Sequence, residues 1–274
     1  MNVGITGAGG YVGSHLARYL EEHGHVAVRI SRSSGLHLGE PIQSKLFKGL
    51  DALIHAAYDF NKRDPAEITR VNVNGSIAIF DAAAKAGVGR IVFISSIAAF
   101  PKCRSLYGKG KLAVETHVLL LGGCVIRPGT VYGADAGGIF RMLSTLAARL
   151  PVIPVPGTGR QPIYLIHIDD LSALIEQLLR ADMPKRSRLV SVACPEPLSL
   201  REILTRIAIG LGKRRVFLPV PTGLLMVGIQ TLETIMGNRC PVRSDSLCSL
   251  LHSDPAPDFT LPKELEGVGC RIFR

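Results

Sequence analysis

The chain has 274 residues, 47% of them hydrophobic, and carries a net charge of +10. This is enough apolar sequence for a large α/β domain with a smaller appendage. The basic charge suits anionic ligands such as phosphates. Nucleic acid is not expected as a partner, because the basic residues are scattered and the chain has no Trp and few aromatic rings to stack on bases.

The cysteines and the apolar stretches indicate no special compartment. The six cysteines show no C-x-x-C spacing, so neither a zinc site nor a disulfide framework is indicated. We expect free thiols in a reducing cytoplasm and no bound metal. No signal peptide is recognisable, and prolines interrupt the apolar stretch 216–232. We expect a strand end and a buried helix there, and no membrane partner.

Residues 3–13 combine a short apolar run with a glycine cluster, and an amphipathic stretch follows. This order predicts a strand, a tight turn and a helix, whose N–H groups and dipole can hold a pyrophosphate. Gly7 would allow the turn, Gly10 would let phosphates approach, and Gly13 would let the helix pack close to the strand. Tyr11 and Val12 complete this candidate cofactor-binding turn. A merely structural glycine turn is the alternative.

The expected second strand, 25–30, ends at Ser31 and Arg32. An acidic residue at this point would bind the ribose 2′-hydroxyl of NAD and repel a 2′-phosphate. Arg32 instead offers a planar charged partner for a phosphate, and Ser31 offers a hydroxyl. We therefore favour NADP over NAD as the cofactor. The alternative is a solvated loop arginine, and backbone contacts could still hold NAD.

Three further segments continue the α/β pattern. Residues 51–57 read as a third strand, after a connection with only a turn of helix near 43–48. Pro65 opens a long helix that reaches about residue 86. The nearly all-apolar run 90–96 is typical of a buried parallel strand, and it ends in Ser95 and Ser96, where such sheets place ligands.

Tyr107 and Lys111 follow at the start of the next expected helix, four residues apart and therefore on one face. A phenol has an ordinary pKa of about 10. The neighbouring ammonium and the positive charge of an oxidised nicotinamide would lower that pKa. Tyr107 could then exchange a proton with a carbonyl or alcohol near neutral pH. A serine hydroxyl from the preceding strand would hydrogen-bond the same substrate oxygen, and Lys111 would hold the nicotinamide ribose.

In this order, the T-G-x-x-G-x-x-G turn at 6–13, the serine pair and the YGKGK segment at 107–111 resemble the extended short-chain dehydrogenase/reductases, the NAD-dependent epimerase/dehydratase family. The resemblance covers about residues 1–180. It implies a Rossmann-type doubly wound parallel sheet, mainly 1–170, with a smaller C-terminal substrate lobe, mainly 171–274 and partly interleaved. It also implies a catalytic triad of Ser96, Tyr107 and Lys111.

Further segments match the same family and imply further roles. The D-x-x-I-H-x-A match at 51–57 implies contacts of its aspartate near the adenine and of its alanines with the dinucleotide, while His55 is interpreted as structural. Asn72 would brace backbone near the site. The cofactor-binding residues expected beyond the turn and Arg32 are therefore Ser31, Asp51, Ala56, Ala57, Asn72, Ser95, Tyr107, Lys111, Pro128 and Thr130. The resemblance further implies a homodimer formed through the helices 65–86 and 107–121.

Three departures from the family pattern narrow the function. Only ten residues separate Ser96 from Tyr107, fewer than is usual. Sugar-nucleotide members commonly carry an Arg-Asp pair where this chain has residues 163–164, so Arg160 is the candidate substrate-binding substitute. Dehydratases carry an acidic pair at positions 97–98, which are Ile and Ala here, so 4,6-dehydration lacks its acid and base.

The sequence therefore predicts an NAD(P)-dependent oxidoreductase that transfers a hydride to or from a keto or hydroxyl group. Reduction of a keto group on a sugar or another small molecule ranks narrowly first. A nucleotide-sugar epimerase is the first alternative. A non-catalytic NADP-binding sensor or scaffold on the same fold is the second.

Overall fold

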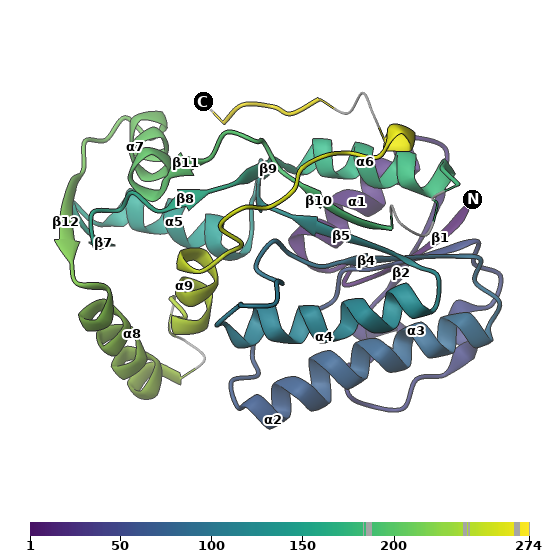
Figure 1. Ribbon diagram of the computed structural model, residues 1–274. Coiled ribbons are helices and arrows are strands. Elements are labelled where there is room, and N and C mark those ends of the chain that lie inside the picture. Colours follow the sequence, from purple (N-terminus) through teal and green to yellow (C-terminus); the bar gives the residue numbers. More distant parts are fainter. Residues whose placement is uncertain (183, 185–187, 238–239, 241, 266–268, 274) are drawn as a thin grey trace.

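The computed structural model describes residues 1–182, 184, 188–237, 240, 242–265 and 269–273. These residues form a six-stranded parallel sheet in the order β10-β5-β4-β3-β1-β2, with helices on both faces (Figure 1). Its strands are β1 (Asn2–Thr6), β2 (Val26–Ile30), β3 (Ala52–His55), β4 (Arg90–Ile94), β5 (Cys124–Pro128) and β10 (Leu189–Val192). The predicted doubly wound fold is confirmed, and the order reverses at β1, which lies between β2 and β3.

Two helix layers bury the faces of this sheet. Helices α1 (Tyr11–Glu22) and α6 (Ile168–Arg180) pack with β1 and β3 into one apolar core. Helices α3 (Gly75–Lys85) and α4 (Leu106–Leu120) lie on the opposite face with a second core. The strands are buried on both faces, which is why their sequences are continuous apolar runs.

The helix expected from Pro65 contains a π-helical insertion. It begins as α2 (Pro65–Ile68), whose N-terminus is capped by the Asp64 carboxylate, and continues through π-helical Thr69–Asn74 into α3. The expected turn of helix before β3 is a 3-10 turn at Ser44–Phe47. A π-helical stretch shifts the side chains of a helix relative to one another, and such stretches are frequent at functional sites.

The remaining elements form a lobe beside the sheet, with its own apolar core. Its three strand pairs are β6–β9, β7–β12 (both parallel) and β8–β11 (antiparallel). The elements are β6 (Thr130–Tyr132), α5 (Gly138–Arg149), β7 (Val152–Pro156), β8 (Pro162–Ile163), β9 (Leu165–His167), β11 (Leu198–Ser199), α7 (Leu200–Gly210), β12 (Val216–Val220), α8 (Thr222–Met236) and α9 (Ser244–Leu251). A capping box of Ser199 and Glu202 begins α7.

The expected division near residue 170 does not follow the packing. Most of helix α6 and all of strand β10 come after that point, yet both belong to the layers of the six-stranded sheet. Helix α5 and strands β7 and β8 come before it, yet they belong to the lobe. The interleaving is therefore more extensive than a single boundary allows, because the chain enters the lobe and returns to the sheet before it enters the lobe again.

Helix α8 corrects the expectation of a buried helix in the apolar stretch 216–232. Ile229 is its one buried residue, while Leu224 and Ile235 are 65% and 75% exposed. Among the described residues, no helix combines the length and the apolar sequence needed to cross a bilayer. The apolar sequence of α8 therefore forms an exposed surface.

The C-terminal segment is attached to the lobe by a disulfide bond. Cys194 and Cys270 are joined, with their Cα atoms 5.6 Å apart. The expectation of free thiols is therefore wrong for this pair, whereas Cys103, Cys124, Cys240 and Cys248 are free. Sequence spacing could not reveal the bond, because its partners lie 76 positions apart and meet only in the folded chain.

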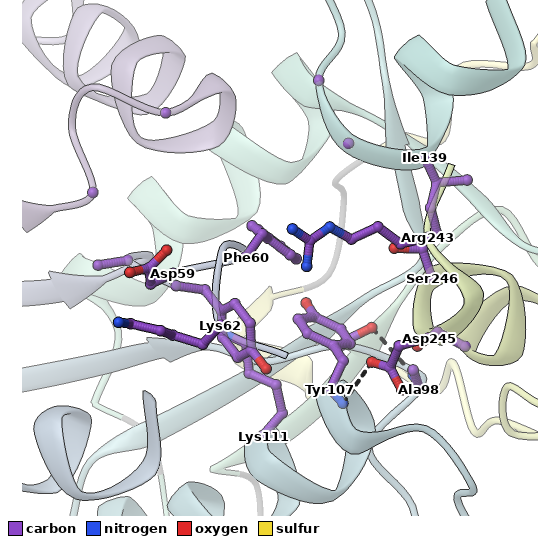
Figure 2. Close-up of a pocket in the computed structure, with 18 of the residues that line it drawn as sticks. Asp59, Phe60, Lys62, Ala98, Tyr107, Lys111, Ile139, Arg243, Asp245 and Ser246 are labelled. Carbon is purple, nitrogen blue, oxygen red and sulfur yellow. Dashed lines mark hydrogen bonds between the residues drawn. The ribbon is translucent and has the colours of Figure 1, made fainter. Parts of the chain in front are cut away.

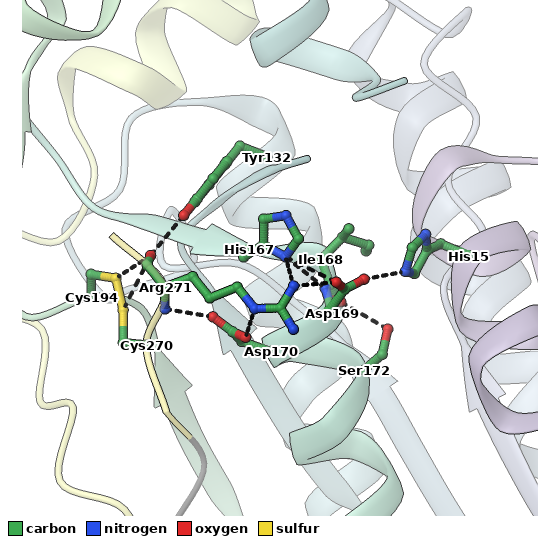
Figure 3. Close-up of polar contacts among 10 residues, drawn as sticks. All are labelled: His15, Tyr132, His167, Ile168, Asp169, Asp170, Ser172, Cys194, Cys270 and Arg271. Atoms are coloured by element: carbon green, nitrogen blue, oxygen red, sulfur yellow. Dashed lines mark hydrogen bonds and ion pairs between the residues drawn. A yellow bond between two sulfur atoms is a disulfide. The ribbon is translucent and has the colours of Figure 1, made fainter. Parts of the chain in front are cut away.

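Arg271 carries most of the other polar contacts of this segment (Figure 3). Its guanidinium pairs with Asp169 and Asp170, and its carbonyl accepts a 2.6 Å hydrogen bond from the Tyr132 hydroxyl. The N-cap of α6 is His167, whose side chain accepts a hydrogen bond from the Asp169 N–H. The aspartates lie in the first turn, where the helix dipole favours negative charge, and hold the tail.

The disulfide should contribute measurably to stability. We expect Cys270→Ser to lower the free energy of unfolding by about 4 kcal/mol. The bond joins residues 76 positions apart, and a cross-link over that span restricts the unfolded chain. Urea unfolding with and without a reductant checks this. The reductant should weaken the wild type to the level of the variant and leave the variant unchanged. Equal midpoints for the oxidised and reduced wild type would contradict the assignment.

Candidate active site

A cleft of about 1700 Å³ runs along the carboxyl edge of the sheet and continues beneath the lobe. Its walls come from the glycine turn, the ends of β2, β3 and β4, the start of α4, and α8 and α9. It therefore includes the point where the strand order reverses, between β1 and β3, which is the usual ligand position in open α/β sheets.

The glycine turn is held by close backbone contacts. Gly7 has a φ of +72°, and a Cβ there would lie 2.7 Å from the Ala57 nitrogen. A Cβ at Gly13 would overlap the Gly7 carbonyl oxygen. Both positions therefore require glycine, Gly7 for its conformation and contact with the end of β3, and Gly13 for the packing of α1 against the turn.

The turn fits a pyrophosphate. Gly9 and Gly10 line the cleft, and a Cβ at Gly9 would meet no atom within 4 Å. No side chain caps α1 and no acidic residue lies in its first turn, so its N–H groups are open to an anion. Tyr11 and Val12 also line the cleft, and the buried Tyr11 hydroxyl has no hydrogen-bond partner among the described residues.

Ser31 and Arg32 lie on the cleft wall at the end of β2. Ser31 is the N-cap of the 3-10 turn Arg32–Ser34, and its hydroxyl lies 2.8 Å from that of Ser33. The Arg32 side chain is exposed and makes no hydrogen bond or ion pair with the described residues. Its guanidinium is therefore available for an anionic ligand.

The position of Asp51 contradicts the expected contact of this residue with the cofactor. It lies at the start of β3, where its carboxylate accepts a 2.6 Å hydrogen bond from the Asn2 N–H. Parallel strands run from this edge to the cleft edge, about 3.3 Å per residue, so Asp51 and the cleft lie at opposite ends of β3. The sequence match could not separate the two ends of a strand. The segment that lines the cleft on this side includes Leu36, Leu38 and Glu40, which the sequence reasoning missed.

The end of β3 is braced from α3 and the π-helical turn. Ala56 and Ala57 line the cleft as expected. Asn72 lies behind the wall, where its side chain accepts a 2.7 Å bond from the Asp59 N–H and donates a 3.1 Å bond to the Asp59 carbonyl. Asn72 itself does not line the cleft, so its expected contact with the cofactor is corrected. Its side chain, carried by the π-helical turn, braces the backbone of Asp59 instead.

His55 has a structural setting. Its ring nitrogens lie 2.6 Å from the Thr6 hydroxyl and 2.8 Å from the Ser76 hydroxyl. Burial lowers its pKa to about 3, with the nearby Lys111 acting in the same direction. The ring is therefore neutral at physiological pH and ties β1 and β3 to α3.

The three expected catalytic side chains meet at the end of β4. Ser96 follows that strand, and it lies close enough to Tyr107, from the first turn of α4, to act on the pKa of that phenol. Lys111, one turn further along, donates a 2.8 Å bond to the Ile94 carbonyl. All three residues line the cleft, as do Pro128 and Thr130.

Ser95 differs from its neighbour. Its hydroxyl donates a 2.5 Å hydrogen bond to the buried Glu115, which also pairs with Arg127. Although Ser95 borders the cleft, its side chain is used within the protein. The expectation of a cofactor contact is therefore limited to its backbone.

The pKa of Tyr107 is raised, whereas it was expected from the sequence to be lowered. Burial raises the pKa of Tyr107 to about 12, Asp245 acts in the same direction, and Ser96 opposes them. Burial lowers the pKa of Lys111 to about 7. The Lys111 nitrogen lies 5.9 Å from the Tyr107 ring centroid. The protein groups alone therefore keep Tyr107 protonated, because desolvation exceeds the effect of the ammonium.

The surroundings of Tyr107 were largely missed by the sequence reasoning. The rings of Tyr58 and Phe60 have centroids 5.0 and 5.8 Å from that of Tyr107. From α9, the Asp245 carboxylate accepts bonds of 2.7 and 3.0 Å from the N–H groups of Leu106 and Tyr107. No local motif marks these residues, because Asp245 lies 138 positions from Tyr107 in the sequence.

Arg243 is the cation that the lobe presents to the cleft near Tyr107. Figure 2 shows its side chain reaching toward Phe60 above the Tyr107 ring. It makes no side-chain hydrogen bond or ion pair with the described residues. Arg160, the expected substrate-binding arginine, is exposed and is not part of the cleft wall, so that expectation is corrected.

Comparisons with known proteins agree with this geometry. The family model "NAD dependent epimerase/dehydratase family" matches residues 3–193. A ceramide reductase of Caulobacter vibrioides is 32% identical over 198 residues, 65% of this chain and 61% of that protein. A UDP-glucose 4-epimerase of Streptomyces lividans is 28% identical over 211 residues, 66% of this chain and 60% of that protein. The chain thus spans about three fifths of the length of these two relatives.

A solved structure extends the likeness to most of the chain. The UDP-glucose 4-epimerase of Thermus thermophilus in complex with NAD superposes with a TM-score of 0.67 at 19% identity, over 92% of this chain and 97% of that one. At this identity the likeness concerns the fold. The family match spans all six strands of the central sheet and the Ser96, Tyr107 and Lys111 group, and so this chain belongs to the NAD-dependent epimerase/dehydratase family.

Proposed function

We propose that the protein is an NADPH-dependent reductase that converts a keto group of a small molecule into a hydroxyl group. The observation that carries this proposal is the meeting of Ser96, Tyr107 and Lys111 at the end of β4, in the same cleft as the glycine turn. A nicotinamide cofactor in that cleft would supply the hydride.

The side chains have complementary parts in the reduction. Ser96 donates a hydrogen bond to the keto oxygen, and Tyr107 transfers its phenolic proton to that oxygen while the carbon receives the hydride. The raised pKa of Tyr107, about 12, keeps the phenol in the proton-donating form at neutral pH. Lys111 binds the nicotinamide ribose and supplies positive charge beside the phenolate that remains.

Two observations favour a reductase over an epimerase. Arg32 is unpaired among the described residues at the end of β2, where a 2′-phosphate would lie, and a reductase exchanges NADPH in every turnover. The similarity to a ceramide reductase supports the same direction. The epimerase alternative is supported by the similarity to UDP-glucose 4-epimerases, but the cleft lacks the expected arginine for a nucleotide diphosphate at Arg160.

The cleft wall beyond Ser96 indicates a substrate with an apolar part. Its apolar lining comes from both the sheet and the lobe: Ile97, Ala98, Ile139, Phe140, Met142, Ile163, Met226 and Leu250. Arg243 adds a positive charge near the reacting position. We therefore propose a ketone that combines an apolar body with a polar or anionic group.

Tyr107→Phe tests whether the protein is a catalyst. The variant lacks the proton donor, so the rate of ketone-dependent NADPH oxidation should fall by roughly 10²–10⁴-fold, whereas NADPH binding by calorimetry should be unchanged. Tyr58→Phe, which removes a neighbouring phenol from the same aromatic cluster, is the matched control and should keep most activity. Full activity in Tyr107→Phe would instead favour a sensor or scaffold.

Arg32→Ala tests the choice of cofactor. We expect the affinity for NADPH to fall about tenfold, or 1.4 kcal/mol, and the affinity for NADH to stay the same, because only NADPH carries the 2′-phosphate. Calorimetric titration of the cofactor-stripped protein measures both. Tightly retained NAD⁺ with no preference for NADPH in the wild type would overturn the reductase proposal and favour the epimerase.

Lys111→Met tests the burial of the amine. The folded protein lowers the pKa of Lys111 from 10.5 to about 7, so between these values the unfolded chain binds more protons than the folded one. Stability should therefore rise with pH across this window in the wild type relative to the variant. Urea unfolding at several pH values measures the difference. The exposed Lys109→Met is the control, and parallel pH profiles of wild type and Lys111→Met would contradict the assignment.

A further inference from the structure

The lobe carries an exposed apolar surface at the end of the molecule farthest from β1 (Figure 1). Ten of the eighteen large apolar side chains that are exposed among the described residues lie on β7, the end of α7, β12 and α8. We call them the apolar end face, and they are Val152, Ile209, Leu211, Val216, Leu218, Leu224, Val227, Leu232, Ile235 and Met236. Strands β7 and β12 pair with each other and α8 packs on β7, so these three elements carry neighbouring parts of the face. Exposed apolar surface of this kind marks interaction sites in many proteins.

The α8 part of this face is a helical stripe. Leu224, Val227 and Ile235 recur at the spacing that puts residues on one side of a helix, and they are 65%, 59% and 75% exposed. On the other side, Met226, Gln230 and Glu233 line the cleft. The helix thus separates the cleft from the exterior, with apolar side chains directed outward.

The charge around the apolar end face is positive. From residue 203 to residue 232 the sequence contains no Asp or Glu, but it contains Arg206, Lys213, Arg214 and Arg215. Lys213 and Arg215 donate to backbone carbonyls at the end of α5, and Arg214 is exposed. Backbone carbonyls carry no net charge, so these contacts leave the positive charge in place.

We propose that the apolar end face docks on the surface of a membrane that contains anionic phospholipids. Apolar side chains directed outward beside cations are the pattern of helices that lie in the interface of a bilayer. Helix α8, with 15 residues, would extend only about 22 Å, which is too short to span the apolar core. The proposal departs from the expectation of no membrane partner, which rested on the absence of a spanning segment.

The same charge disfavours a second copy of the chain as the occupant. A two-fold dimer through this face would bring two positively charged patches together, each with its own Lys213, Arg214 and Arg215. The homodimer expected from the family resemblance would use α2, α3 and α4 instead. Docking on a membrane goes beyond the reductase proposal, and it would place the α8 wall of the cleft beside a source of amphiphilic ketones.

Sedimentation with vesicles tests the docking. The full chain should bind vesicles of equal parts phosphatidylcholine and phosphatidylglycerol at least about tenfold more tightly than pure phosphatidylcholine vesicles, and less tightly as salt rises. The triple variant Leu224→Gln, Val227→Gln, Ile235→Gln should reduce binding about tenfold or more. Leu120→Gln, on an 81% exposed leucine of α4, is the matched apolar control and should bind like the wild type.

A charge variant and two readouts complete the design. Arg214→Gln should weaken binding to anionic vesicles and reduce its salt dependence, whereas Lys48→Gln, an exposed lysine before β3, should not. Absent binding to anionic vesicles, or equal binding by the triple variant, overturns the proposal. A change in oligomeric state without vesicle binding assigns the face to a second copy. Tyr107→Phe should bind vesicles normally, so loss of the reductase proposal and loss of docking are separable.

Discussion

The geometry of the candidate active site depends on one buried carboxylate. Glu115 on α4 accepts a 2.5 Å hydrogen bond from the Ser95 hydroxyl at the end of β4 and pairs with Arg127 of β5. It is only 3% exposed, so the paired charge is what makes its burial tolerable. Through these bonds α4 is fixed against two neighbouring strands. Tyr107 and Lys111 are on the same helix, and their positions relative to Ser96 follow from that attachment.

The lobe contributes to the same helix from its other end. Asp245 of α9 binds the N–H groups of Leu106 and Tyr107, where the helix dipole is positive and a carboxylate is favoured. The same carboxylate helps to raise the pKa of Tyr107. The pKa of the proposed proton donor is therefore set by both parts of the protein, and the position of the lobe affects the candidate site as well as the cleft wall.

Local patterns predicted the parts of this structure that local chemistry determines. The glycine turn, the apolar strand before Ser96 and the spacing of Tyr107 and Lys111 all act within a few residues, so the sequence shows them directly. The cofactor contact predicted for Asp51 was wrong, because a motif match does not tell which end of a strand faces the ligand. Asp245, Arg243 and the disulfide partners meet residues far along the chain. Helix α8 was expected to be buried because apolar sequence does not distinguish a core from an exposed binding face.

The burial of Lys111 lowers the stability of the folded protein. Among the described residues its ammonium has one hydrogen-bond partner, the Ile94 carbonyl, and it otherwise faces the rings of Phe93 and Tyr58 at 4.6 and 5.5 Å. Cation–π contacts and one carbonyl replace only part of the lost hydration, so burial lowers the pKa of Lys111 to about 7. A group that is destabilising in the folded chain is retained where chemistry needs it. That cost is smallest when a ligand supplies the missing polar contacts, which ties the stability of the end of β4 to the occupation of the cleft.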